Sequence, residues 1–386
     1  MENFFQRLLP SARRTEPQQA TDTNARDVSA LLEVPIKRHS IPAMACAIIW
    51  KGRVTAQGVA GVRKAGSQEP ATLSDRWHLG SCTKSMTATL AAILDAEGIV
   101  SLNTTLQEGL GNVVQNIHPR WRNVTLDLLL HHRGGAPNEL HAHGLWSELW
   151  QFGGNPSQAR LLLAKGVLAR PPEVRPGTKY IYSNAGYALV GAVLENITGI
   201  PWETLLQERV WKPLGIASGS FGAPGVRNGR VVDAPRGHKD DGTPVEPGPG
   251  SDNPSAIGPA GTVAMTIGDW ARYVALHLEA GRSDFSPRLL SSEAFQKLHS
   301  PLPNDEAAYA MGWISVAEGL WGGRALTHSG SNTMWYCTVW VYQDYAILVT
   351  SNQGGEEARK ACDEVVQSLK QNHQEHNGNR LLSFFS

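Results

Sequence analysis

The segment from Trp77 to Leu94 reads WHLGSCTKSMTATLAAIL and decides the fold and chemistry of this 386-residue chain. Residues after Lys84 are almost all apolar or small, which is typical of a buried helix, and Gly98 suits its C-terminal end. Positions i and i+3 share a helix face, so the Lys84 amine can reach the Ser81 hydroxyl. Burial lowers the pKa of a lysine, and the first N–H groups of a helix can face an oxyanion. The segment therefore predicts a nucleophile, its base and half an oxyanion hole.

An isolated S-x-x-K also fits a plain alternative, with Ser81 capping the helix and Lys84 extending to solvent. Two further motifs argue against that alternative. Tyr182-Ser183-Asn184 follows a Pro-Gly turn and precedes an apolar run, 185–198, that predicts a helix. His328-Ser329-Gly330 lies at the end of a run that predicts a strand and is followed by Ser331. Each of these has its own structural explanation, as a helix cap or a glycine turn.

Together, S-x-x-K, Y-x-N and H-x-G in this order resemble the serine hydrolases of the penicillin-recognising fold. These include class C β-lactamases, low-molecular-weight DD-peptidases, D-aminopeptidases and family VIII carboxylesterases. The resemblance covers about residues 27–370. It is also carried by Trp77 to Gly80, Leu128 to His132, Gly258-Pro259-Ala260-Gly261 and Thr350-Ser351-Asn352.

The resemblance implies a role for each matching residue. Ser81 would be the acylated nucleophile, Lys84 its activating neighbour and Tyr182 the phenol that moves the proton. Substrate would be bound by Asn184, by His328 with Gly330 on the strand that borders the site, and by the Ser331 N–H as second oxyanion donor. From its place beyond Gly330, Trp335 is a further candidate for the cleft.

The position of His328 bears on the substrate, because many β-lactamases carry lysine there. Histidine titrates near neutral pH and holds an anion less firmly than lysine does. We therefore expect a serine hydrolase that acts through an acyl-enzyme on small carboxylic esters. A DD-peptidase or D-amino-acid amidase with weak β-lactamase activity is one alternative, and a catalytically silent, penicillin-binding-like protein is the other.

The composition limits the classes of partner that we expect this protein to bind. Lys+Arg and Asp+Glu are equal at 35 each, so there is no basic excess to bind nucleic acid. No apolar run is long enough for a membrane span, and no secretory signal is evident, so we expect a cytoplasmic protein. The four scattered cysteines and the His141-Ala142-His143 segment lack metal-site spacing, so no metal or other cofactor is expected. A small ester or amide is the expected partner, and the oligomeric state stays open.

Strand patterns occur at both ends of the chain, at 43–50, 53–61, 309–316, 325–328, 335–342 and 345–350, and helix patterns lie between them. They predict an α/β (α+β) protein of the serine β-lactamase/DD-peptidase-like fold, in which one antiparallel sheet joins both ends of the chain. We divide the chain into a polar arm (1–26), an α/β lobe (27–80 and 266–386) and a mostly helical lobe (81–265). The Gly/Pro-rich excursion 218–261 predicts a long surface segment, with or without a border on the cleft.

Overall fold

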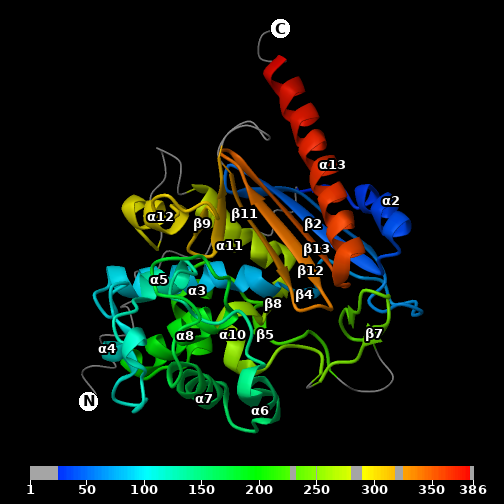
Figure 1. The fold of residues 1–386 in the computed structure, drawn as a ribbon. Coiled ribbons are helices and arrows are strands. Elements are labelled where there is room, and N and C mark those ends of the chain that lie inside the picture. The colour runs from blue at the N-terminus through cyan, green and yellow to red at the C-terminus, as the bar shows by residue number, and fades with distance from the viewer. Residues whose placement is uncertain (1–24, 227–231, 249, 280–288, 318–324, 383–386) are drawn as a thin grey trace.

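The computed structural model describes residues 25–226, 232–248, 250–279, 289–317 and 325–382. An eight-stranded sheet at its centre joins both ends of the chain (Figure 1). It is antiparallel except where β1 pairs in parallel with β3. In sheet order, its strands are β1 (Arg26–Asp27), β3 (Arg53–Gly61), β2 (Ala43–Trp50), β13 (Tyr345–Ser351), β12 (Tyr336–Val341), β11 (Ala325–Ser331), β10 (Trp313–Val316) and β9 (Tyr309–Ala310).

Strand β2 is apolar on both faces because helices cover both sides of the sheet. Its even-numbered side chains, such as Met44 and Ile48, pack in one core with α2 (Ala30–His39) and α13 (Gly355–Leu382). Its odd-numbered side chains, such as Ala45 and Ile49, join a larger core with α3 (Thr83–Ala96) and α11 (Ile267–Glu279). The period of two along one strand thus divides its residues between two cores.

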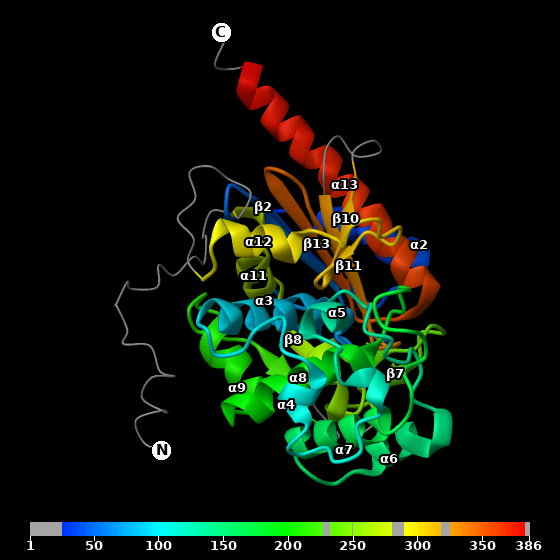
Figure 2. The ribbon, with the colours of Figure 1, turned by 60° about the vertical axis from the view of Figure 1, so that its left-hand side comes forward.

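Most of the helices between residues 106 and 211 lie beyond α3 on the side away from α13, whereas α11 packs against the large sheet (Figure 2). A second sheet, β5 (Ser220–Phe221), β8 (Val263–Thr266) and β4 (Arg76–His78), leads into the 3-10 helix η1 (Gly80–Cys82) and then α3. The other helices are α4 (Leu106–Leu110), α5 (Leu126–Leu130), α6 (Leu145–Gln151), α7 (Pro156–Leu168), α8 (Asn184–Thr198), α9 (Trp202–Leu206), α10 (Gly258–Gly261) and α12 (Ser292–His299), with 3-10 turns at Pro119–Trp121, Ala142–Gly144 and Ser255–Ile257 and a π-helical turn at Gln207–Trp211.

The expected strand 309–316 is wrong as one element, because β9 and β10 are the two arms of a tight hairpin. Its turn contains Gly312, which has φ +78° and lies so close to the Ser85 backbone that a Cβ would overlap it. A glycine is therefore needed both for the turn and for its packing against α3. The excursion 218–261 contains more structure than expected, namely β5, α10 and the two-stranded pair β6 (Gly237–His238) and β7 (Pro244–Val245).

The fold class predicted from the sequence is confirmed. The division into two lobes stays a prediction, and the polar arm lies almost entirely outside the described residues. In the described part of the chain, no helix combines the length and apolar character that a membrane crossing needs.

Candidate active site

Ser81 lies in η1, at the end of a segment pressed against strand β11. Gly80 has φ +46°, and a Cβ on it would overlap the Ser331 backbone. A Cβ on Gly330 would overlap the Leu79 carbonyl. Because both positions are glycine, the backbone before Ser81 and the strand that carries Ser331 lie in direct contact. The two N–H groups expected to hold an oxyanion therefore come from neighbouring segments.

Lys84 is the second residue of α3, three residues after Ser81, and is fully buried. Its Nζ is 3.2 Å from Ser81 Oγ, 2.7 Å from Asn184 Oδ1 and 2.9 Å from the carbonyl oxygen of Ala260. Burial lowers the pKa of the Lys84 amine from its usual 10.5 to about 7. A substantial share of this lysine is therefore neutral near pH 7.

The Ala260 carbonyl is held at the site by contacts of α10 and of the start of β8 with α3. Thr87 Oγ1 donates to the Pro259 carbonyl at 2.7 Å, and the Val263 N–H donates to Thr83 Oγ1 at 3.1 Å. Sequence reasoning singled out the Gly258 to Gly261 segment as similar to the family but assigned Ala260 no role. Its contribution is a backbone oxygen, which the residue type does not reveal.

Tyr182 and Asn184 flank the capping residue of α8. Ser183 Oγ accepts the Gly186 N–H at 3.1 Å and donates to the Pro137 carbonyl at 2.6 Å. Lys84 Nζ lies 4.7 Å from the centre of the Tyr182 ring, and the Ser81 hydroxyl acts on the Tyr182 phenol in the direction that lowers its pKa. Burial raises the pKa of the Tyr182 phenol well above its usual 10, so it holds its proton at neutral pH.

An aromatic layer that the sequence analysis missed packs behind Tyr182. The His132 ring centre is 4.5 Å from that of Tyr182 and 4.6 Å from that of Tyr309. His132 Nδ1 accepts the Ser183 N–H at 3.1 Å, which ties this layer to the start of α8. The adjacent histidines 131 and 132 were a sequence signal, but only the tertiary contacts separate the histidine that touches Tyr182 from the other.

His328 is buried beneath the strand edge, and both of its ring nitrogens have partners within the protein. Nδ1 lies 2.6 Å from the Ser329 carbonyl and Nε2 lies 3.1 Å from the Tyr309 hydroxyl. Because a carbonyl can only accept, Nδ1 carries a proton, and in the uncharged ring Nε2 accepts from Tyr309. His328 thus belongs to the inner layer of the site, 6.4 Å from Tyr182 between ring centres.

The structure does not bring Trp335 to the cleft. Its side chain is 1% exposed and packs edge-on against Trp77, with ring centres 6.2 Å apart. Trp335 precedes β12 and points into the larger core, beside the segment that leads to Ser81. The other sequence-predicted residues lie on η1, α3 and β11, at the start of α8 and, for Tyr182, just before α8.

Several known proteins are similar to this chain in sequence. Penicillin-binding protein 4 of Amycolatopsis lactamdurans is 28% identical over 66% of this chain and 64% of its own length. Unguisins hydrolase ungD' of Aspergillus campestris is 24% identical over 75% of this chain and 54% of its own length. A β-lactamase of Escherichia coli K12 is 26% identical over 68% of this chain and 62% of its own length. Each alignment spans less than two thirds of the relative.

Solved structures show the same fold at lower identity. The octameric penicillin-binding protein homologue of Pyrococcus abyssi superposes with a TM-score of 0.70 and 22% identity, over 89% of this chain and 76% of that one. D-alanine carboxypeptidase AmpC of Burkholderia cenocepacia superposes with a TM-score of 0.67 and 20% identity, over 88% of this chain and 97% of that one. The family description Beta-lactamase matches residues 22–370, which is most of the chain. This protein therefore belongs to the beta-lactamase family.

Proposed function

We propose that this protein is a serine hydrolase that acts through an acyl-enzyme on small carboxylic esters. The observation that carries the proposal is the set of three oxygens around Lys84 Nζ. Asn184 Oδ1 and the Ala260 carbonyl can only accept, so they take the two N–H groups of a neutral amine. The lone pair is then left for the proton of the Ser81 hydroxyl, 3.2 Å away. A lysine in this state is a general base.

The two titrating neighbours of Ser81 have opposite pKa shifts, which supports different roles. Burial lowers the pKa of Lys84 to about 7 and raises that of Tyr182, so near neutral pH the amine accepts a proton and the phenol keeps its own. Lys84 takes the proton as Ser81 Oγ bonds to the ester carbon. The N–H groups of Ser81 and Ser331 hold the resulting oxyanion.

The intermediate collapses when the bond from carbon to the alcohol oxygen breaks. Tyr182 gives its proton to that oxygen and receives the proton that Lys84 had taken, so the alcohol leaves neutral and the acyl group stays on Ser81. Water then attacks the acyl-enzyme by the same sequence, with Lys84 as base. The products are a carboxylic acid and an alcohol, and no atom beyond ester and water is needed.

The surroundings of His328 favour an ester without a free carboxylate. Both nitrogens of the uncharged ring are hydrogen-bonded, to the Ser329 carbonyl and the Tyr309 hydroxyl, so the strand edge offers no fixed positive charge. The relatives that are named as a penicillin-binding protein and a β-lactamase keep a second candidate open. That candidate is a DD-peptidase or D-amino-acid amidase with weak β-lactamase activity.

The test combines turnover with intact-mass analysis. Wild-type protein is mixed with p-nitrophenyl butyrate, a D-alanyl-D-alanine peptide and a penicillin. We expect fastest turnover of the ester and an acyl adduct on Ser81, both lost in Ser81→Ala. Ser85→Ala, which removes a hydroxyl one turn along the same helix, is the matched control and should retain both. Preference for the peptide would favour the second candidate, and absence of any adduct or turnover would favour a silent binding protein.

A further inference from the structure

The carboxylate of Asp252 joins the two segments that form the proposed oxyanion hole. Its Oδ2 lies 2.8 Å from His78 Nε2, three residues before Ser81. Its Oδ1 accepts the Asn332 side-chain amide at 3.2 Å, one residue after Ser331. Asp252 itself belongs to the Gly/Pro-rich segment 218–261, which therefore reaches the site through this side chain as well as through the Ala260 carbonyl.

His78 carries the link from Asp252 to the backbone at Ser81. The Gly80 N–H donates to His78 Nδ1 at 3.1 Å, so Nδ1 is unprotonated and Nε2 carries the proton that faces Asp252. His78 is 0% exposed, and water cannot replace either contact without entering the core. Gly80 has the left-handed φ of +46° described above. The chain of two hydrogen bonds therefore holds this backbone conformation beside Ser81.

The groups around Asp252 are hydrogen-bond donors, so both of its side-chain oxygens have to accept. Besides the Asn332 amide, the Asn253 N–H donates to Oδ1 at 2.7 Å, and Oδ2 faces the His78 N–H. An asparagine at position 252 would turn its NH₂ group toward one of these donors in either orientation. A carboxylate is thus the one side chain of this size and shape that satisfies all three.

We infer that Asp252 and His78 are positioning residues that set the distance between the Ser81 and Ser331 N–H groups. The inference rests on the proposed function, in which those two groups hold the oxyanion. Neither side chain contacts the Ser81 hydroxyl, and their effect passes through Gly80 and Asn332. Loss of the link should weaken stabilisation of the transition state more than binding of the substrate.

The first test compares an ester with its thionoester in wild type and Asp252→Asn. Sulfur accepts hydrogen bonds poorly, so the ratio of kcat/KM values for p-nitrophenyl acetate and its thionoester reports on the oxyanion donors. Removing one such donor outright costs about 100- to 1,000-fold in kcat, so displacing it should cost about 10- to 100-fold. We expect Asp252→Asn to lower kcat on the ester by this factor, with little change in KM, and to lower the ratio about tenfold.

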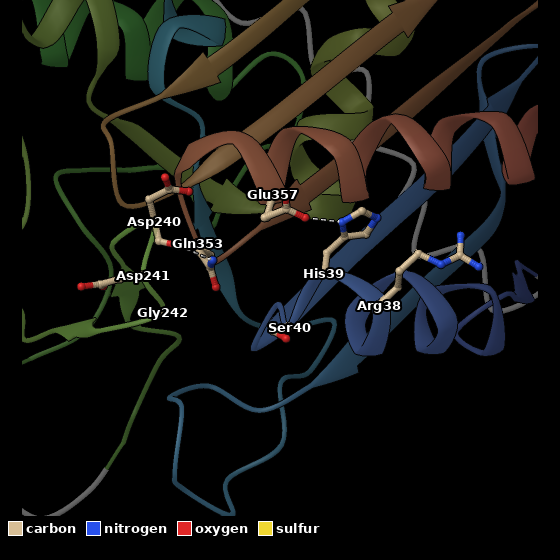
Figure 3. A pocket seen from close by; sticks show the side chains of 8 residues that line it. All are labelled: Arg38, His39, Ser40, Asp240, Asp241, Gly242, Gln353 and Glu357. Atoms are coloured by element: carbon tan, nitrogen blue, oxygen red, sulfur yellow. Dashed lines mark hydrogen bonds and ion pairs between the residues drawn. The ribbon is translucent and has the colours of Figure 1, made fainter.

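The matched control is Asp241→Asn, the same substitution in the same Gly/Pro-rich segment. Asp241 also accepts a backbone N–H, from Thr243 at 2.9 Å, but it lines a surface pocket of about 270 Å³ bordered by His39 and Glu357 (Figure 3). It should behave as wild type in both measurements. If Asp252→Asn lowers kcat/KM for the ester and for the thionoester by the same factor, the role of Asp252 is general stability and the inference is overturned.

A second variant keeps the inference testable if Asp252→Asn folds poorly. His78→Asn retains an oxygen that can accept the Gly80 N–H two residues on, but it does not extend to Asp252. It should lower the ester-to-thionoester ratio in the same direction. The double variant should keep about the same kcat/KM as the less active of the two single variants, because both substitutions break the same chain of contacts. Multiplied effects would show two independent roles and overturn the inference.

Amide hydrogen exchange separates this inference from the proposed function. In Asp252→Asn, the amides of Gly80 to Cys82 and of Ser331 to Thr333 should both exchange faster, while the Asp241→Asn control should match wild type. This measurement needs no turnover. An inactive wild type would therefore sink the proposed function alone, and exchange that rises in neither segment or in only one would overturn the link through Asp252.

Discussion

Acylation of Ser81 should follow the titration of Lys84, because only the neutral amine can accept the hydroxyl proton. Burial brings the pKa of Lys84 from 10.5 to about 7, so roughly half of the molecules carry a neutral amine at pH 7. A lysine with the ordinary value would be neutral in about one molecule in 3,000 at that pH. We expect the acylation rate to rise about tenfold per pH unit below 7 and to level off above it.

The assay is the single-turnover release of p-nitrophenol from an ester, followed by stopped flow between pH 5 and 10. Lys84→Ala should lower the plateau by about 100- to 10,000-fold, the usual range for loss of a general base, and remove the inflection near 7. His328→Gln serves as the control for the assignment, because His328 lies in the same layer of the site as Tyr182. The inflection should persist in that variant whatever happens to the rate.

Two results would refute this reasoning. An inflection near 10 in wild type would mean that Lys84 stays charged and that the site is open to water. An inflection near 7 that survives in Lys84→Ala would assign the titration to another group. In either case the lone pair derived from the Asn184 and Ala260 contacts would not be the base.

Three further predictions concern the neighbours of this pair. Tyr182→Phe should lower ester turnover about a hundredfold or more, and its cost should be far less than additive with that of Lys84→Ala, as a double-mutant cycle measures; full additivity would mean separate roles. His328→Lys should shift the ratio of kcat/KM for a penicillin over a neutral ester about tenfold toward the penicillin, since a fixed charge favours a carboxylate, and an unmoved ratio would make His328 purely structural. Burial lowers the pKa of His299 to about 4 and that of its neighbour His277, 2.9 Å away, well below 6.5. The unfolded chain therefore binds protons first, and the free energy of unfolding, complete above about pH 6.5, should fall toward pH 4 by up to about 1.4 kcal/mol per pH unit for each histidine; constant denaturant midpoints from pH 7 to 5 would contradict this.

Local patterns in the sequence were sufficient for many elements of the fold. The expected strands 43–50 and 53–61 have the observed bounds of β2 and β3, and the expected helix 185–198 is α8 less its first residue. These segments have an unbroken apolar period and clear turns at their ends, so local propensity and burial agree. The hairpin at 309–316 was missed because its glycine turn is required by contact with α3, which no local window contains.

The spacing of Ser81 and Lys84 is likewise local, because three residues along a helix bring side chains to one face. Everything else around the lysine came from tertiary structure. Asn184 lies 100 residues away along the chain, and the Ala260 oxygen is a backbone atom with no signature in residue type. The sequence indicated Asn184 only through its motif, and it indicated no acceptor at Ala260.

Tertiary packing also decided which neighbouring side chains serve the site. Trp335 was expected at the cleft from its place after Gly330, but the core beside Trp77 buries it. The sequence indicated no chemical role for His78 or Asp252, yet His78 Nε2 and Asp252 Oδ2 lie 2.8 Å apart although 174 positions separate the two residues along the chain. The sequence by itself predicted the fold and indicated Ser81 and Lys84 as the candidate nucleophile and base, since short-range spacing, periodicity and the order of the motifs carry these predictions. Only the folded chain decided the acceptors around Lys84 and the link between Asp252 and His78, because hydrogen bonds between distant segments depend on how those segments pack.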